Sequence, residues 1–494
     1  MENSNRRLLL IIGGISLFVC ACIAIAALVG SGLFFWTVAS PSTSVEDPVG
    51  TSLPEIQPSP ALEVEETSPS SSSPSQTPQQ NATLSPTEAG PGTGSNLPGE
   101  ITRQMDEIQK QVIDLRGLRS NGSVERALLT PEQLRDHVMN NFLADYTSDE
   151  ARDDVIFYSQ LGLLEPDFDL QEFFLELYSE QVAGFYDDET KEMYVVRGEG
   201  FEGPERLTYA HEYTHALQDQ NYDFEDGLNF NDEACDENTE RCAALQALIE
   251  GDASATEFEW FVEHGTQEEL LQIQEFFENF ESPIFDSAPS FMREDFIFPY
   301  NYGQSFVENL RSRGDWEAVD RVYQAPPVST EQILHPERYP EDEPVPVTIP
   351  DLAPIFGEGW REVDRDTLGE WYTFLLLAHG LQENTRVEAS TAQSAAEGWE
   401  GDAYVVYHND ETGQSALVLD TLWESENDAG EFGDAFREYA GNRFGESSLD
   451  DVNLTAWENS EAATEFRVDG QRTVWVLAPN ADLLQAISTA LQGQ

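Results

Sequence analysis

The hydrophobic residues that begin near position 100 recur at helical spacing. Ile101, Met105, Ile108, Val112 and Leu115 stand three or four positions apart. This spacing places their side chains on one face of an α-helix. The folded part of the chain is therefore predicted to begin with an amphipathic helix.

A second helix start and a hairpin follow. In Thr130-Pro131-Glu132-Gln133, Thr130 can cap a helix, proline is tolerated in the first turn, and Gln133 can complete a capping box. Beyond it, the hydrophobic pattern keeps its helical period for two segments and then shortens to the alternation of strands. The elements predicted here are helices over residues 149–163 and 170–180, and a hairpin of strands at 182–186 and 193–196.

The chain opens with an apolar run of a different kind. Residues 8–36 carry no charge, and this run exceeds the roughly 20 residues that a helix needs to cross a bilayer. Arg6 and Arg7 precede it, and no other Lys or Arg occurs before Arg103. The positive-inside rule then places residues 1–7 in the cytoplasm. We therefore expect a transmembrane anchor over residues 8–36.

Composition divides the rest of the chain. Residues 37–98 are rich in Pro, Ser and Thr and cannot bury enough apolar surface to fold, which predicts a disordered stalk. The Pro-rich segment 339–354 separates two folded halves, residues 99–350 and 351–494. The predicted fold class is α+β, with an N-terminal transmembrane helix and stalk, a mainly helical domain with a small sheet, and a C-terminal α+β domain.

The C-terminal half mixes helix and strand patterns and carries no chemical motif that we recognise. Trp399 and Trp423 are expected in its core, and the isolated His379 and His408 are expected to be structural. The predicted strands are residues 403–407, 415–422, 463–468 and 472–477, and the predicted helices are 366–380, 428–444 and 481–491.

Charge and cysteines restrict the partners and the compartment. The chain has 93 Asp and Glu against 25 Lys and Arg, a net charge of −68, which would repel nucleic acids and anionic lipid headgroups. Cys235 and Cys242 lie close together in the sequence. Outside the cell they could form a small disulfide loop, and otherwise they would be free thiols. Nothing in the sequence indicates the oligomeric state.

The segment His211-Glu212-Tyr213-Thr214-His215 contains the motif HExxH. Residues four apart lie on one face of a helix, so both imidazoles can bind one metal ion. Glu212 lies beside them and can take a proton from a water that attacks a carbonyl. The motif therefore predicts a catalytic Zn²⁺ site with His211 and His215 as ligands.

The flanks of the motif resemble those of the zincin metallopeptidases. Thr208 and Tyr209 precede it and Ala216-Leu217 follows it, as in the extended zincin motif. Residues 184–187 resemble the edge strand along which zincin substrates lie. The resemblance covers roughly residues 100–345, and it implies a zincin-like catalytic domain that hydrolyses peptide bonds.

The third metal ligand distinguishes the zincin classes. Metzincins carry a third His at the position of Asn221, so the resemblance is to the gluzincins, which use a Glu on a later helix. It implies Glu250 as the third ligand. Asp252 remains an alternative, either as the ligand or as a group that orients a ligand His, and Glu257 is a more distant candidate.

A hydrolase of this kind also needs a donor for the oxyanion that develops during the reaction. Tyr300, Tyr302 and His335 are candidates, although each could equally be structural. We take Tyr302 and His335, together with Glu212, as the candidate catalytic residues.

The sequence thus predicts a zinc endopeptidase that acts on peptides or proteins outside the cell and is held at the cell membrane by a single N-terminal helix. Two alternatives remain. The first is a non-catalytic surface binding or adhesion module, in which the zinc site is structural or vestigial. The second is a zinc amidase that cleaves cell-wall peptides.

Overall fold

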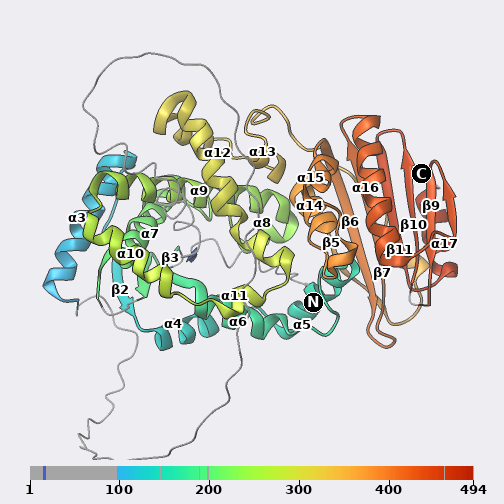
Figure 1. The fold of residues 1–494 in the computed structure, drawn as a ribbon, viewed down its shortest axis with the longest axis horizontal. Coiled ribbons are helices and arrows are strands. Elements are labelled where there is room, and N and C mark those ends of the chain that lie inside the picture. Colours follow the sequence, from blue (N-terminus) through green and yellow to red (C-terminus); the bar gives the residue numbers. More distant parts are fainter. Residues whose placement is uncertain are drawn as a thin grey trace, which may run out of the picture. The chain divides into compact units, whose positions relative to one another are not determined.

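The computed structural model describes residues 15–17, 97–144, 146–188, 190–196, 200–460 and 462–492, with only the backbone of residues 15–17 (Figure 1). All of these residues belong to one compact unit. The predicted cytoplasmic segment 1–7 and nearly all of the predicted stalk 37–98 lie outside the described residues.

The predicted fold class is wrong in its first element. Within the run 8–36, the described residues form strand β1 (Ile15–Leu17), which pairs antiparallel with a later strand. No described helix has both the length and the apolar composition that a membrane crossing requires. The rest of this run lies outside the described residues. The prediction of a transmembrane helix is therefore wrong for residues 15–17, which form a strand.

Helices dominate the part of the chain that precedes residue 350. The predicted start at Thr130 is confirmed by a complete capping box with Gln133. Thr147, which the sequence pattern did not indicate as a cap, forms another with Glu150. The elements of this part are α3 (Gly99–Arg116), β2 (Glu125–Leu129), α4 (Pro131–His137), η2 (Val138–Phe142), α5 (Ser148–Gln160), α6 (Leu170–Gln181), β3 (Val182–Asp187), β4 (Glu192–Val196), α7 (Gly203–Tyr222), α8 (Asp232–Glu237), α9 (Thr239–His264), α10 (Gln267–Asn279), α11 (Pro283–Ser287), α12 (Ser290–Val322) and α13 (Thr330–Leu334).

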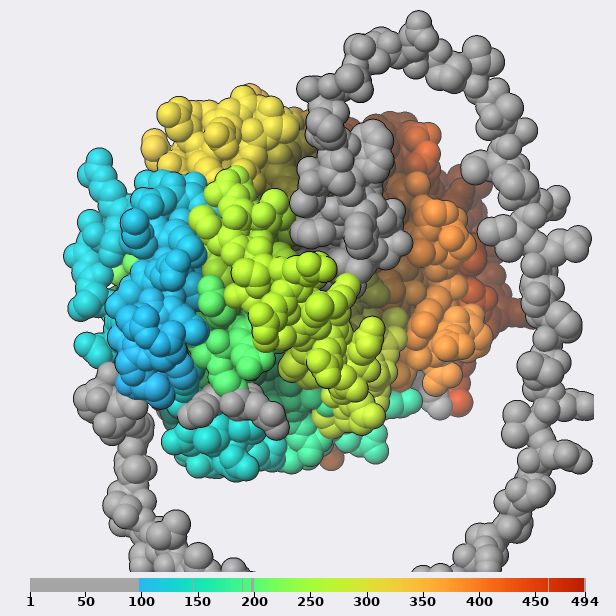
Figure 2. All heavy atoms as spheres, turned by 60° about the vertical axis from the view of Figure 1, so that its left-hand side comes forward, coloured from blue at the N-terminus to red at the C-terminus, as the bar shows by residue number. Residues whose placement is uncertain are grey.

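A small sheet accompanies these helices in the order β1-β3-β4-β2. Strands β3 and β4 form the predicted hairpin, with Phe185 opposite Tyr194, and β2 runs parallel to β4. Strand β3 therefore lies between two described neighbours and is not the edge strand that the zincin resemblance implies. Helices α3 and α10 both contact α7. Figure 2 shows α3 in blue and the segment from about residue 260 to 290 in yellow-green on one face, with green residues between them.

Helices α9 and α12 cross at two glycines. A Cβ atom built on Gly303 would lie 2.0 Å from the carbonyl oxygen of Ala247, and one built on Gly251 would lie 2.2 Å from the backbone of Gly303. Any side chain at either position would push the helices apart. The crossing therefore places α12 directly against the turn of α9 that contains Glu250.

The C-terminal part contains a seven-stranded antiparallel sheet in the order β5-β6-β7-β11-β10-β9-β8. The four predicted strands correspond to β6, β7, β10 and β11, whereas β5, β8 and β9 were not predicted. The elements of this part are η3 (Ala353–Ile355), β5 (Trp360–Asp366), α14 (Gly369–Ala378), η4 (Glu383–Thr385), α15 (Ala389–Ala396), β6 (Trp399–Asn409), β7 (Gln414–Trp423), α16 (Glu426–Phe444), β8 (Leu449–Asp451), β9 (Leu454–Glu458), β10 (Ala463–Asp469), β11 (Arg472–Ala478) and α17 (Ala481–Gln492).

Both faces of this sheet are covered. Successive side chains of a strand point to opposite faces. Accordingly, Tyr404 and Val406 join the main hydrophobic core, while Val405 and Tyr407 join a second cluster with α17 and the segment around Ile349. The main core also contains residues of α5, α6, α9 and α12. Apolar packing therefore continues across the predicted boundary near residue 350 (Figure 1).

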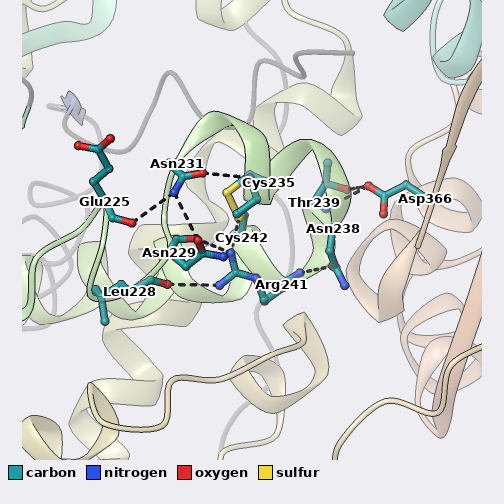
Figure 3. Close-up of a disulfide and its surroundings, with 11 residues drawn as sticks. Glu225, Leu228, Asn229, Asn231, Cys235, Asn238, Thr239, Arg241, Cys242 and Asp366 are labelled. Atoms are coloured by element: carbon teal, nitrogen blue, oxygen red, sulfur yellow. Dashed lines mark hydrogen bonds between the residues drawn. A yellow bond between two sulfur atoms is a disulfide. The ribbon is translucent and has the colours of Figure 1, made fainter. Parts of the chain in front are cut away.

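The N-terminus of α9 carries two further links. Cys235 and Cys242 form the predicted disulfide, which ties α8 to α9 (Figure 3). Next to it, the backbone N–H and the hydroxyl of Thr239 both donate to Asp366 at the end of β5, at 3.0 and 2.6 Å. The helix that carries Glu250 is thus fixed to the C-terminal sheet at its first residue.

Candidate metal centre

Helix α7 presents the HExxH motif at its centre. It begins at Gly203-Pro204, and the backbone N–H of Glu202 donates to Glu205, which stabilises the first turn. The side chains of His211, Glu212 and His215 are at most 2% exposed. Burial among protein atoms strengthens the electrostatic interactions between these groups.

Glu250 completes a potential ligand set with the two histidines. Its Oε2 lies 3.1 Å from Nε2 of His211 and 3.3 Å from Nε2 of His215. The ligand atoms of the three residues lie within 4.8 Å of one another. The structure thus brings together the three residues that the sequence analysis proposed as metal ligands, two from α7 and one from α9.

The chemistry of these atoms fits Zn²⁺. Two imidazole nitrogens and one carboxylate form the open three-ligand set of catalytic zinc sites. The Oε1 atom of Glu250 and the Nε2 atom of His215 are buried and make no hydrogen bond with the described residues. A buried polar atom without a partner is costly, and coordination to a cation would satisfy both atoms.

Glu257 holds the other ring nitrogen of His211. Nδ1 of His211 lies 2.9 Å from Oε2 of Glu257. Glu257 therefore contacts the ring nitrogen that faces away from Glu250, and it does not belong to the ligand set. Burial disfavours the charged imidazolium, but the hydrogen bonds and charges of Glu250 and Glu257 outweigh it and raise the pKa of His211 to about 10. A metal ion and a proton would therefore compete for Nε2 of His211.

Asp252 is also not part of the ligand set. Its carboxylate accepts two hydrogen bonds from Arg116, at 2.7 and 3.0 Å, and one from the hydroxyl of Tyr323 at 2.9 Å. The side-chain nitrogen of Gln218 donates to the same carboxylate, and the side-chain oxygen of Gln218 lies 2.8 Å from Nδ1 of His215. Of the two sequence alternatives for Asp252, the structure therefore favours the orienting role.

Strand β3 packs closely against the helix beside Glu212. A Cβ atom built on Gly184 would lie 2.7 Å from Cγ2 of Thr208 and 3.3 Å from Cγ of Glu212. Glycine at this position therefore lets the strand backbone approach the motif directly.

The candidate oxyanion donors lie in different places. The ring of Tyr300 is centred 6.4 Å from the ring of His211. Tyr302 packs instead against Phe298 and Trp371, with ring centroids 5.3 Å away in each case.

His335 is positioned by the C-terminal part of the chain. It follows α13, and its Nε2 lies 2.8 Å from Glu370 of α14. The structure thus gives Tyr302 and His335 other partners and places Tyr300 beside a proposed metal ligand.

The sequence pattern did not indicate Arg116 or Gln218, and it indicated Glu257 only as a candidate ligand. A signal exists for Glu257, because a seven-residue interval from Glu250 corresponds to two helical turns and puts both residues on one face. Gln218 lies three residues after His215 on the same helix face. No pattern indicates Arg116, which is far from the motif in sequence.

A second acidic group involves Glu331, Asp342 and Glu424. Arg338 lies among the three carboxylates, with its Nη1 at 3.0 Å from Glu331 and 3.1 Å from Asp342, and it also pairs with Glu424. The arginine accounts for the convergence of these charges, so we do not assign a metal to this group.

Comparison with known proteins yields one match. The family model described as Domain of unknown function (DUF8575) matches residues 356–488, which span the C-terminal sheet and its helices. No curated protein and no solved structure matches the chain. The match does not include α7 or α9, so it gives no information about the candidate metal centre.

Proposed function

We propose that the chain is a zinc-dependent metallopeptidase of the gluzincin type, with His211, His215 and Glu250 as zinc ligands. The convergence of these three side chains from two helices is the observation that carries the proposal. The buried Glu212 in the same helix supports it, because a carboxylate at this position of the motif can act as the general base.

In this proposal the protein supplies the ligands and the proton transfers. Bound zinc would lower the pKa of the attacking water and polarise the scissile carbonyl. Glu212 takes the proton of that water on its carboxylate as the water attacks. It then donates the same proton to the nitrogen of the leaving amine, which is released as the new N-terminus of the product.

The surroundings of Glu212 favour an extended peptide as the substrate. Residues 15–17 pair antiparallel with β3, with Ser16 opposite Gly184. An extended segment can therefore form backbone hydrogen bonds along β3, next to the general base, and a substrate would bind there in place of residues 15–17. Addition of a strand to a sheet is a common mode of peptide recognition.

We also propose that the folded part works outside the cytoplasm. The disulfide between Cys235 and Cys242 supports this location, because structural disulfides persist mainly in oxidising compartments.

The first experiment uses the purified full chain with zinc supplied. Glu212→Gln removes the general base and preserves the size of the side chain. We expect it to retain zinc and to lose about 10²- to 10⁴-fold in the rate of peptide cleavage. The rate is measured by mass spectrometry on an unfolded protein substrate. Glu268→Gln is the control, because Glu268 is an exposed residue of α10, and it should cleave at the wild-type rate.

The outcomes separate the candidate functions. Full activity of Glu212→Gln would exclude Glu212 as the general base. Zinc binding without cleavage of protein or cell-wall peptides by the wild type would favour a binding module, and cleavage of wall peptides alone would favour an amidase.

A further inference from the structure

Gln218 is a buried side chain whose amide orientation is fixed by its neighbours. Its exposed fraction is 0%. One end of the amide faces the backbone oxygen of Ile249 at 2.9 Å and Oδ2 of Asp252 at 3.1 Å. The backbone oxygen of Ile249 can accept a hydrogen bond but cannot donate one. This end must therefore be the NH₂ group, and the amide oxygen must be the end that faces His215.

The orientation of the Gln218 amide determines which ring nitrogen of His215 carries the proton. The amide oxygen of Gln218 lies 2.8 Å from Nδ1 of His215. A carbonyl oxygen can accept but not donate, so Nδ1 carries the proton of this hydrogen bond. The lone pair of the neutral ring is then on Nε2, which lies 3.3 Å from Glu250.

Asp252 is itself held in place. Arg116 at the end of α3 grips it with two hydrogen bonds, and Arg116 and Asp252 are both 0% exposed. The hydroxyl of Tyr323 donates to Asp252 at 2.9 Å and lies 3.0 Å from the amide nitrogen of Gln218. Since α3, α9 and Tyr323, which directly follows α12, all contribute, rotation of the Gln218 amide would break several buried hydrogen bonds at once.

We propose that Gln218 is a positioning residue for the metal centre: locked by Asp252, Arg116 and Tyr323, it fixes His215 as the Nδ1–H tautomer and aims its Nε2 at the metal. This inference rests on the proposed function, because it assumes that His215 is a zinc ligand. It adds a series of hydrogen bonds that runs from Gln218 of α7 to Asp252 of α9 and from there to Arg116 of α3.

The two histidines are thus supported differently. His211 is held directly by the carboxylate of Glu257. His215 is held by the neutral amide of Gln218. The carboxylate of Asp252 contacts this amide and not the imidazole of His215. Partners of this kind orient the ligands of metal sites, and their removal typically lowers metal affinity about 10- to 100-fold.

The test compares Gln218→Met with Gln246→Met in the full chain. Methionine has nearly the same length as glutamine but cannot accept the proton of His215. Gln246 is another buried glutamine, 2% exposed, on α9, and its Nε2 makes no hydrogen bond with the described residues. It is therefore a matched control for burial. Zinc affinity is measured by competition with a chelator. The imidazole protons are followed by NMR on ¹⁵N-histidine-labelled, zinc-loaded protein.

We expect zinc affinity to fall about 10- to 100-fold in Gln218→Met and to stay at the wild-type value in Gln246→Met. The wild type should show a slowly exchanging Nδ1–H on His215, and Gln218→Met should lose the slow exchange of this proton alone. Equal affinity of both variants, or an Nε2–H tautomer of His215 in the wild type, would overturn the inference. The second result comes from the wild type and does not depend on the folding of a variant.

Failure of the proposed function has a different result. A wild type that binds zinc but cleaves nothing would refute the peptidase proposal, and the positioning role of Gln218 would still be decided by the affinities and the tautomer. A wild type that binds no zinc would overturn both proposals.

Discussion

Tyr300 lies beside the proposed ligand His211, whereas Tyr302 packs against Trp371, and we therefore propose Tyr300 in place of Tyr302 as the oxyanion donor. The ring of Tyr300 lies 6.4 Å from that of His211, and its side chain is 2% exposed. Loss of one such donor typically lowers the rate about 10²- to 10³-fold. Tyr300→Phe should therefore lower kcat by this amount with little change in KM. Tyr302→Phe is the control, because Tyr302 packs against Trp371. A larger loss of kcat in Tyr302→Phe would reverse the assignment.

At the residue scale, the sequence predicts site residues best where all of them lie on one helix. His211, Glu212 and His215 stand close together in sequence, so helical periodicity alone brings them to one site. Glu250 follows only from a family resemblance. The partners of the histidines depend on which faces of α3, α7 and α9 meet. That information belongs to the tertiary structure, which explains why Arg116 was missed.

At the scale of elements, the crossing of α9 and α12 determines where Glu250 lies. Gly303→Ala would put a methyl group 2.0 Å from the carbonyl oxygen of Ala247. We expect it to lower the free energy of unfolding by about 1–3 kcal/mol and to weaken zinc binding, because α9 must move. Thermal unfolding and chelator competition measure the two effects.

Gly441→Ala provides the matched control. Gly441 lies in α16, and a Cβ atom at this position would have no neighbour within 4 Å. Since alanine favours helix over glycine, the substitution should be neutral or stabilise the protein by up to about 1 kcal/mol. Equal effects of the two substitutions would show that the α9–α12 crossing is not a close contact.

Elements with strong local patterns were predicted well, and weakly patterned strands were not. The predicted helix start at Thr130 uses a side chain that caps its own backbone, which is a local interaction. Strand β8 is exposed at all three positions, so it has no hydrophobic alternation to detect. Residues 15–17 show the opposite error, because a short apolar stretch is compatible with a strand as well as with a helix.

At the scale of the whole molecule, buried carboxyl groups lie where the two parts of the chain meet: a Cβ atom built on Gly369 would lie 2.2 Å from Oε2 of Glu240. Glu240 of α9 accepts hydrogen bonds from the backbone N–H and the hydroxyl of Thr330. Burial raises the pKa of Glu240 to about 8, because the hydrogen bonds from Thr330 only partly offset it and the charges of Asp402 and Glu370 add to it. Burial also raises the pKa of Asp402 to about 6.

These shifts predict how stability depends on pH. The folded protein holds the proton of Glu240 up to about pH 8, whereas the unfolded chain releases it near 4.5. The contribution of this group to stability is therefore complete below about pH 4.5 and is lost as the pH rises toward 8. Glu240→Gln mimics the protonated form. Its melting temperature relative to the wild type should rise between about pH 5 and pH 9. A difference that is constant or falls with pH would contradict this account.

The packing of the two parts of the chain against each other was the feature that the sequence predicted least. The Pro-rich segment 339–354 suggested two separate halves, but the main hydrophobic core draws on both. Contacts such as Thr239 with Asp366 join residues that are far apart in sequence, and no local pattern indicates them. The hypothesis of a metal centre on α7 and α9 does not depend on this packing, because its ligands belong to two neighbouring helices.

The most direct test of the central claim is removal and return of the metal. Cleavage of an unfolded protein by the purified full chain is followed by mass spectrometry before chelation, after chelation, and after one equivalent of zinc is added back. The account predicts that cleavage stops when zinc is removed and recovers with the added equivalent. Cleavage that continues after complete removal of the metal would contradict it.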